Sequence, residues 1–592
     1  MLKRCGLFFI FLALSGHAFC AQNQSLDLEP IVILRPKSYF LNSFSLKAKD
    51  FSASPVESLR NLPIDLQSRS PAKGIQTDFS LRGSNFQGVL FLLNGQRIND
   101  PQTGHHNADF PFTQADIEKI DLIPGLSSSL FGPDAIGGAI NFLTKKPQDR
   151  QAVLEGSYGA FNTKSGLVSF TERIKDLRFR VSSEYAKSDG FRYDTDFKKY
   201  TATFSSSLDA PYGAFNLNFG YQDKEFGAFD FYTPGSGFPS REWTKTYLLD
   251  TGLLSENEGV MIKPNFLWRR HYDRFMLDET GVRSRYLNQH RTDMYTPNIY
   301  FQKQIGLLGR AGLGIEYGRE EIHSTNLGKH LRNHESVFLD GTNDINSRLS
   351  LSGSLRIDNF DGFDTAYTGS LNFRYRIQES QALALSISRS MRIPTFTELY
   401  YNDPTTVGDP GLSDEKAANF QLGYDYKRGG LSFGAVLFFR EEKDTIDWIK
   451  RSAADPKWQA QNITEAQVCG LESYFKYEIN KYVNLSSNYA YINKNVADGG
   501  YLYKYGQNYS RHLANIMVNF NLPCGTQGLA LTYKQKPSRS GWFLLNSHFS
   551  CNIAKHAGIF LGITNVLDVK YEEIAGIPQP GRSFEGGVRF EW

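Results

Sequence analysis

Cysteine, net charge and long apolar runs are all scarce in this chain of 592 residues. Its five cysteines are too few for a disulfide-built fold and show no metal-binding spacing. A formal net charge of +3 gives no strongly basic chain, so we expect no nucleic-acid partner. After residue 21, no apolar run reaches the roughly 20 residues that a membrane-spanning helix needs.

Familiar catalytic patterns are missing as well. The chain has no His-Glu-x-x-His helix, no glycine loop ending in Gly-Lys-Ser and no Gly-x-Ser-x-Gly turn. The pair Gly137-Gly138 lies among β-prone residues, where tight turns explain it better than a phosphate loop. We therefore predict that the protein is not an enzyme and requires no cofactor.

Residues 1–21 have the features of a secretory signal peptide. Lys3 and Arg4 give the positive start, residues 7–14 form a short apolar centre, and small residues offer cleavage within 18–21. The apolar centre is too short for a membrane anchor. Export without a helical anchor predicts a secreted protein, a periplasmic protein or an outer-membrane barrel.

From residue 151 onward, apolar and polar residues alternate strictly, which predicts β-strands. In the first clear strand, the apolar face holds Leu177, Phe179, Val181 and Tyr185, and the other holds Arg178, Arg180, Ser182 and Glu184. The polar face is too rich in charged and hydroxyl side chains for the core of a β-sandwich. It fits a barrel with lipid outside and a wet lumen inside.

The connections between these strands alternate in length, as in outer-membrane barrels. Short turns are predicted at 173–176, 209–213, 255–258, 305–308, 343–346, 378–381, 427–430, 479–482, 521–526 and 554–557. Long loops are predicted at 224–243, 270–291, 391–416, 444–467 and 493–510. This pattern predicts about 22 strands, and the lack of a fixed internal period excludes a soluble propeller or repeat array.

The stretch from Thr77 to Lys146 differs from everything after it. It holds short apolar runs, such as residues 89–93 and 139–143, each bounded by Gly, Asn, Asp or Pro. We interpret it as a compact globular insert. The predicted domains are a signal peptide at 1–21, a polar tail at 22–40, this insert at 41–147 and the barrel at 148–592.

Three motifs in the insert carry a family resemblance. Leu81-Arg82-Gly83, Leu92-Leu93-Asn94-Gly95 and the run from Leu130 to Asn141 resemble the plug domain of TonB-dependent outer-membrane receptors. The last strand, ending at Trp592, resembles the family's C-terminal signal for barrel assembly. The resemblance implies an all-β fold: an antiparallel transmembrane β-barrel of about 22 strands, with an N-terminal globular plug in its lumen, in the outer membrane.

The resemblance also implies a function. Receptors of this family take up large, scarce nutrients with energy from the inner membrane, and the size of this chain is most similar to the vitamin B12 (cobalamin) receptor branch. Cobalamin is therefore the expected ligand, and a ferric siderophore or haem is the alternative. A passive porin or an adhesin is the alternative from a different class, and the plug argues against both.

In such receptors the TonB box, near the N-terminus, pairs as an added strand with the periplasmic TonB protein. The residues at that place here are Glu29, Pro30, Ile31, Val32, Ile33 and Leu34. The implied partners are TonB, the ligand, the barrel-assembly machinery and outer-membrane lipid, and we expect a monomer. The short tail before residue 29 disfavours a signalling receptor with an added regulatory domain.

Two plug segments are the candidate ligand contacts, because the family's apical plug loops touch the substrate. They comprise Ser84, Asn85 and Phe86, and then Asn99, Asp100, Gln102, Thr103, His105, His106 and Asn107. The alternative for the second segment is a solvated loop, since it is rich in turn formers. In an extended chain His105 and His106 would point opposite ways and would not chelate one metal together.

Two further predictions concern the barrel. Asp189, Asp194 and Asp196 lie in one expected outer loop, where Asp194 and Asp196 can face one way and bind calcium. The cobalamin receptor orders its loops in this manner, and solvated surface charge is the alternative. Cys524 and Cys551 should lie close together at the periplasmic end of one hairpin, where a disulfide can form.

Overall fold

The computed structural model describes residues 44–47, 54–70, 75–125, 128–148, 150–211, 213–232, 234–280, 287–306, 309–496 and 499–592. The predicted signal peptide and the predicted TonB box at residues 29–34 lie outside these residues. Among the residues described, no helix has both the length and the apolar character needed to cross a membrane.

The N-terminal domain is a small mixed α/β unit. Its elements are β1 (Phe44–Lys47), α1 (Pro55–Ser58), η3 (Leu59–Asn61), β2 (Asp65–Ser70), β3 (Gln76–Ser80), η4 (Phe86–Gly88), β4 (Val89–Leu93), β5 (Gln96–Arg97), η5 (Gly104–His106), β6 (Ile117–Pro124), α2 (Ser128–Phe131) and β7 (Gly138–Thr144). Five strands form one sheet in the order β1-β6-β7-β4-β5, and β2 and β3 form a separate hairpin.

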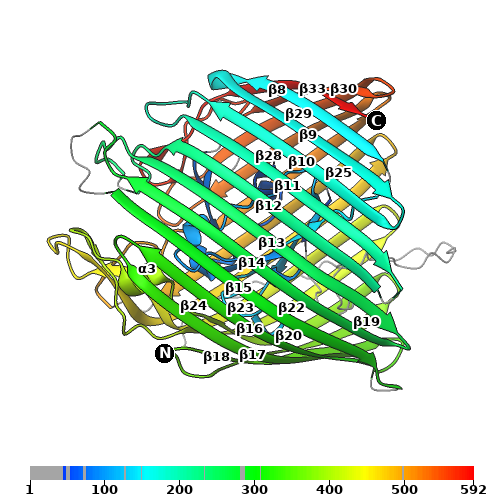
Figure 1. Ribbon diagram of the computed structural model, residues 1–592, viewed down its shortest axis with the longest axis horizontal. Helices are drawn as coiled ribbons and strands as arrows, with labels where there is room; N and C mark the ends of the chain where they lie inside the picture. The colour runs from blue at the N-terminus through cyan, green and yellow to red at the C-terminus, as the bar shows by residue number, and fades with distance from the viewer. Residues whose placement is uncertain are drawn as a thin grey trace, which may run out of the picture.

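Strand β4 explains why this domain has continuous apolar runs. Phe91 packs in one apolar cluster with Phe142, whereas Leu90 and Leu92 pack in another with Ala139. Successive side chains of a strand point to opposite faces, so both faces of the sheet are covered. The domain lies inside the barrel, where neither face of the sheet meets open solvent (Figure 1).

The rest of the chain forms a closed antiparallel barrel of 22 strands. The strands are β8 (Gln151–Gly159), β9 (Thr163–Ile174), β10 (Leu177–Ser188), β11 (Phe197–Ala210), β12 (Gly213–Gly227), β13 (Arg241–Asn257), β14 (Val260–Met276), β15 (Leu287–Gln304), β16 (Arg310–Ser324), β17 (Gly328–Asp344), β18 (Leu349–Phe360), β19 (Ala366–Gln378), β20 (Gln381–Arg392), β22 (Glu415–Arg428), β23 (Leu431–Lys450), β24 (Trp458–Asn480), β25 (Val483–Val496), β27 (His512–Leu522), β28 (Gly525–Gln535), β29 (Trp542–Ala554), β30 (Ala557–Thr564) and β33 (Ser583–Glu591). Short pairings β21 (Thr406–Val407), β26 (Leu502–Tyr503), β31 (Glu572–Ile574) and β32 (Ile577–Pro578) occur in the loops.

The last strand closes the barrel against the first. Strand β33 pairs with β8, from Glu585 opposite Gly159 to Glu591 opposite Val153. The main chains of Trp592 and Ala152 also exchange two hydrogen bonds, each of 3.0 Å. Figure 1 shows the strands running obliquely round the wall, with α3 at one end and the C-terminus at the other. Closure leaves no unpaired sheet edge, as a membrane barrel requires.

Polarity in the barrel is reversed relative to a soluble protein. Leu177, Val181 and Tyr185 are exposed on the outer wall, whereas Arg180 and Ser182 are buried against the plug. This confirms the predicted faces, since an apolar outer band suits lipid and a polar inner wall suits a wet lumen.

All ten predicted short turns lie at one end of the barrel, to within a few residues. The predicted long loops were too long in several places. Strands β23 and β24 continue to Lys450 and from Trp458, so most of the predicted loop 444–467 is a ladder that satisfies its own backbone groups. Strands β12 to β15 likewise extend into the predicted loops 224–243 and 270–291.

The connection between β20 and β22 folds inward over the plug. It contains α3 (Phe396–Tyr400), which begins with a capping box between Thr395 and Glu398. The main-chain N–H groups of Phe396 and Thr397 donate to the carbonyl oxygens of Pro101 (2.9 Å) and Gln102 (3.1 Å). A barrel loop therefore covers one of the two predicted plug loops.

Candidate functional site at the plug apex

The two predicted plug segments meet at the long-loop end of the barrel. Asn85 caps η4 by accepting a bond from the N–H of Gly88 (3.0 Å), and this places Phe86 beside η5. The side-chain oxygen of Gln87 accepts a bond from the N–H of Gly104 (2.6 Å), which joins the segments. The rings of Phe86 and His105 stack with centroids 4.2 Å apart.

Barrel loops complete this aromatic cluster. Tyr505 lies edge-on to Phe86 at 5.1 Å, and Tyr232 lies edge-on to His105 at 5.8 Å. We call Phe86, His105, Tyr232 and Tyr505 the aromatic platform. The His105 side chain keeps 13% of its surface exposed, so the platform is accessible at one edge. Such a surface suits a planar or apolar ligand through stacking.

Two charged residues beneath the platform, Asp78 and Arg69, hold His105 in place. Its Nδ1 lies 2.7 Å from Asp78, and Asp78 accepts a bond of 2.6 Å from Arg69. Burial lowers the pKa of His105 more than the neighbouring Asp78 carboxylate raises it. Burial alone would raise the pKa of Asp78, but Arg69 and His105 outweigh it and hold that pKa below its usual range. His105 is therefore neutral at neutral pH, above an ionised Asp78–Arg69 pair.

The polar segment 99–107 is buried, so the solvated-loop alternative is wrong. Asn99 accepts a bond from the N–H of Phe91 (2.7 Å) and donates to the carbonyl of Val89 (2.9 Å). Asn107 accepts a bond from the N–H of Asp100 (2.9 Å). The turn-forming residues serve the fold of the plug because they replace a backbone ladder with side-chain bonds.

His105 and His106 lie in a 3-10 turn and not in an extended chain. They still diverge, because successive residues of a 3-10 helix project about 120° apart. His106 Nε2 lies 3.4 Å from Asp273 Oδ2 of β14. Burial lowers the pKa of His106, but the carboxylates of Asp273 and Asp109 outweigh it and raise that pKa to about 9.

A buried group of charged side chains joins the plug to strands β12–β15. Lys224 pairs with Asp109, and Arg269 pairs with Asp100. His271 lies between the two carboxylates, 2.9 Å from Asp109 and 3.1 Å from Asp100. We call the following set the plug–barrel charge cluster: Asp100, His106, Asp109, Lys224, Glu242, Arg269, His271, Asp273 and His290.

Comparison with known families agrees with this architecture. Residues 45–139 match the family described as TonB-dependent Receptor Plug Domain, and residues 145–566 match TonB dependent receptor-like, beta-barrel. The chain belongs to the TonB-dependent receptor family. Members of this family are receptors and transporters, and not enzymes.

Curated relatives of this receptor include vitamin B12 transporters. The chain is 25% identical over 493 residues to the vitamin B12 transporter BtuB of Photobacterium profundum, covering 78% of each chain. It is 23% identical over 446 residues to BtuB of Vibrio vulnificus, covering 71% of this chain and 69% of the relative.

Solved receptor structures share the fold. The ferric enterobactin receptor PfeA of Pseudomonas aeruginosa, in a complex with enterobactin, superposes with a TM-score of 0.75 at 15% identity, over 93% of this chain and 99% of that one. The siderophore receptor PirA of Acinetobacter baumannii has a TM-score of 0.76 at 13% identity, over 93% and 98% of the two chains.

Sequence reasoning missed the barrel side of the receptor's site. Glu242, His271, Asp273 and His290 fell in stretches that we predicted as loops, whereas they lie on strands β13, β14 and β15. The signal was present as polar residues at every second position, since Arg269, His271 and Asp273 face the lumen together. No such alternation of polar residues in the sequence marked Tyr505 as part of the site.

Ser84 has a structural role in the receptor. It is buried, its carbonyl accepts a bond from Ser80 Oγ (2.6 Å), and its Oγ accepts from the N–H of Leu81 (3.4 Å). The preceding motif residue, Arg82, reaches the barrel wall, where its Nη2 lies 2.6 Å from Glu472. The segment is thus anchored on either side of Phe86.

The carboxylates of Asp189, Asp194 and Asp196 do not all face one point. Asp194 and Asp196 face the guanidinium of Arg241, at 3.7 Å and 2.9 Å, while Asp189 accepts a bond from Asn162 (2.9 Å). Burial raises the pKa of Asp194 to about 6, because Arg241 offsets it only in part and Glu279 adds to it. Calcium at this loop stays a prediction, and Arg241 already supplies a cation there.

Cys524 and Cys551 lie side by side at the short-turn end. Gly525 is the register partner of Cys551, and the N–H of Asn552 donates to the carbonyl of Cys524 (2.6 Å). The two cysteines are not joined by a disulfide. The predicted hairpin of β28 and β29 is therefore present. Cys469 lies within β24, opposite Phe439 and Asn493, and not near the end of its strand.

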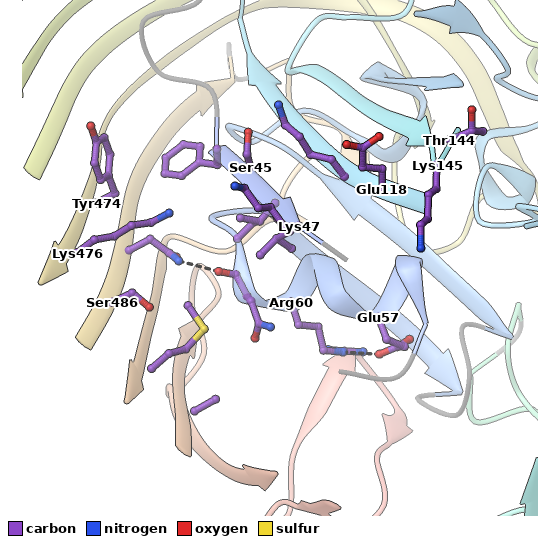
Figure 2. Close-up of a pocket in the computed structure, with 18 of the residues that line it drawn as sticks. Ser45, Lys47, Glu57, Arg60, Glu118, Thr144, Lys145, Tyr474, Lys476 and Ser486 are labelled. Carbon is purple, nitrogen blue, oxygen red and sulfur yellow. Dashed lines mark hydrogen bonds and ion pairs between the residues drawn. The ribbon is translucent and has the colours of Figure 1, made fainter. Parts of the chain in front are cut away.

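A cavity of about 2760 Å³ lies between the plug and the barrel wall. Figure 2 shows charged side chains along it, with Lys47, Glu118 and Lys145 from the plug and Lys476 from β24. Its lining also includes Phe161 at the long-loop end. The space exceeds the roughly 300–1,000 Å³ of an ordinary ligand pocket, so the plug does not fill the lumen beside it.

Proposed function

We propose that the receptor imports a large, scarce nutrient across the outer membrane with energy supplied through TonB, and that the nutrient is cobalamin. The observation that carries this proposal is the aromatic platform, which both plug segments and two barrel loops build together. A corrinoid is a broad planar ligand that stacks well on such a surface. The identity of the curated relatives supports cobalamin over other planar cargo.

The platform and the transducer contact lie on opposite sides of the plug in this proposal. Ligand reaches the platform from the long-loop end, and TonB pairs with residues 29–34 at the short-turn end. The cavity beside the plug supports passage, because a moderate shift of the plug would extend a space that already exists. The exposed apolar outer wall supports an outer-membrane location.

A ferric siderophore or haem is the alternative cargo, and neither needs a different architecture. A passive porin is disfavoured because the plug is tied to the wall by buried ion pairs such as Arg82–Glu472 and Arg180–Asp116. We propose no catalytic activity. Calcium at Asp189, Asp194 and Asp196 is a separate proposal, which calcium titration of the Asp196→Asn variant would test.

Transport assays in a deletion strain test the cargo. We expect the chain to restore growth on limiting cobalamin and to take up radiolabelled cyanocobalamin, with no gain on ferric enterobactin or haem. Growth on the iron compounds without cobalamin uptake would overturn the cargo and leave the receptor class intact. A non-energised strain is the control, because binding should persist there while uptake stops.

A further inference from the structure

We propose that His106, Glu242 and Asp273 form a binding site for a divalent transition-metal ion, which ties the plug to the barrel wall. In this group one ligand atom of each residue lies within 4.8 Å of the other two. The plug supplies the imidazole, and strands β13 and β14 supply the carboxylates. All three side chains are buried. The proposal concerns a tie inside the receptor and does not depend on which nutrient is transported.

The spacing of the ligand atoms suits a metal ion. Around a tetrahedral zinc ion with bonds of about 2.0–2.1 Å, neighbouring ligand atoms lie roughly 3.3 Å apart. His106 Nε2 and Asp273 Oδ2 are 3.4 Å apart. His290 is the register partner of Asp273 on β15, and its Nε2 lies 4.0 Å from the same oxygen. A small rotation of His290 would supply a fourth ligand.

Unpartnered atoms at the same place point to a missing ligand. Asp273 Oδ1, His106 Nδ1 and His290 Nδ1 are buried and have no hydrogen-bond partner within the described part of the chain. Buried polar atoms are nearly always bonded, and leaving one unmade costs about 1–3 kcal/mol. Three such atoms within one small group suggest that the ring orientations are set by something other than protein bonds.

The charges of the cluster also leave a deficit that a divalent ion would balance. Four buried carboxylates, on Asp100, Asp109, Glu242 and Asp273, face two permanent cations, Arg269 and Lys224. Protonated His106 beside Asp273 brings the positive charges to three, one fewer than the carboxylates. Arg269 forms its ion pair with Asp100, and Lys224 forms its ion pair with Asp109. In the described ranges, neither lysine nor arginine forms an ion pair with Glu242 or Asp273. Buried carboxylates are stable only when paired or bound to metal.

A second group in the cluster, His106 with Asp109 and His271, is the weaker candidate. Asp109 already pairs with Lys224 through Oδ1 and contacts His271 through Oδ2, so a metal ion would have to break the direct contact between two of its own ligands. Glu242 has fewer existing contacts than Asp109, because it accepts one hydrogen bond of 2.7 Å from Tyr232. That bond can persist as outer support for a metal-bound carboxylate. Imidazole with carboxylates suits zinc and ferrous iron rather than calcium.

Metal content of the full receptor, purified in detergent, tests the proposal. We expect about one equivalent of zinc per chain by mass spectrometry after incubation with ZnCl2 and gel filtration. Incubation with Co²⁺ alone should give the visible absorption bands of a tetrahedral site. The variants Glu242→Gln and Asp273→Asn should bind zinc more than tenfold more weakly, since loss of mere supporting groups already costs about 10–100-fold.

The matched control is Asp250→Asn, which removes a buried carboxylate from the same strand as Glu242. Asp250 accepts bonds from Asn94 (2.6 Å) and Gln96, so it also contacts the plug without belonging to the cluster. This variant should bind zinc like the unmodified receptor. Absence of zinc and cobalt from the unmodified receptor would overturn the proposal, whether or not the variants fold. Equal binding by all variants would overturn it too, and would leave an ion pair of protonated His106 with Asp273 as the role of the group.

Discussion

Arg82 of the plug and Glu472 of β24 form a doubly bonded ion pair inside the barrel. Arg82 Nη2 and Nε lie 2.6 Å and 3.0 Å from the two carboxylate oxygens, and both side chains are almost fully buried. Breaking a buried pair leaves an uncompensated charge, at a cost of about 3–5 kcal/mol. We expect Glu472→Gln to loosen the plug by that amount.

Hydrogen exchange of residues 75–125 measures this loss. Asp209→Asn is the matched control, because its pair with Lys146 is about half exposed and should contribute less than about 1 kcal/mol. Equal protection in Glu472→Gln and the unmodified receptor would mean that the pair does not hold the plug.

The aromatic platform makes a prediction about affinity. Phe86→Ala removes one stacked ring and should weaken cobalamin binding about tenfold, since an aromatic contact contributes about 1 kcal/mol beyond its area. Tyr193→Ala is the control, because that ring is 64% exposed in an outer loop. Titration calorimetry in detergent distinguishes them, and unchanged affinity in Phe86→Ala would exclude the platform as the binding surface.

The charge state of His105 sets the pH dependence of the same measurement. Burial lowers its pKa beyond what Asp78 restores, so the neutral ring is the stable form in the folded receptor. The contribution of a neutral His105 is fully present at neutral pH and is lost as the pH falls through the lowered pKa. We expect constant affinity from pH 7 to 8, and a rise in affinity on acidification would contradict this assignment.

Deletion of residues 29–34 should abolish uptake and leave surface binding unchanged. The reason is that the aromatic platform lies at the long-loop end, whereas we propose that TonB binds from the opposite side of the plug. Radiolabelled binding and uptake are measured on the same cells, with an internal deletion in the exposed loop 451–456 as a control. Parallel loss of binding and uptake would count against separate faces.

Removal of Phe590 and Trp592 should impair barrel assembly. Their rings stack at 6.0 Å, and Trp592 is 56% exposed beside the closing seam of β33 and β8. The main-chain bonds of Trp592 to Ala152 are lost as well. The measurement is the amount of heat-modifiable protein in outer-membrane fractions, and normal amounts would refute the prediction.

Cys524 and Cys551 should form a disulfide under oxidising conditions, because the register of β28 and β29 places the two residues side by side. Alkylation followed by mass spectrometry before and after mild oxidation measures the bond. Cys469 is the internal reference and should remain alkylated throughout. Two reactive thiols after oxidation would show that the geometry at this turn does not permit the bond.

The barrel could be predicted from the sequence because its signals are local. Alternation every second residue and short turns specified the strands, the lipid-facing side and the number of strands. The parts of β23 and β24 at the long-loop end could not be predicted as strands, because residues such as Thr445 and Asp447 resemble loop residues. They pair outside the membrane, where no apolar face is required.

The candidate site could be predicted only in part. Phe86 and His105 were found through motifs, but their partners depend on how the plug is rotated within the lumen. Arg82 meets Glu472 across 390 residues, and Arg269 meets Asp100 across 169 residues. Such contacts follow from two folded bodies fitting together, and the local pattern of neither body specifies them.

Strand β1 gives the plug a mechanically weak edge. Among the described residues it pairs with β6 alone, through four residue pairs from Phe44 to Lys47. The partner strand is held where it begins, because Asp116 directly precedes β6 and binds Arg180, Ser182 and Thr203 of the wall. A pulling force applied from the N-terminal side would therefore separate β1 from β6 one residue pair at a time. Only then would the force reach the contacts that Asp116 makes with the wall. A small force could remodel the plug in sequence, while the rest of the domain keeps its attachment to the barrel.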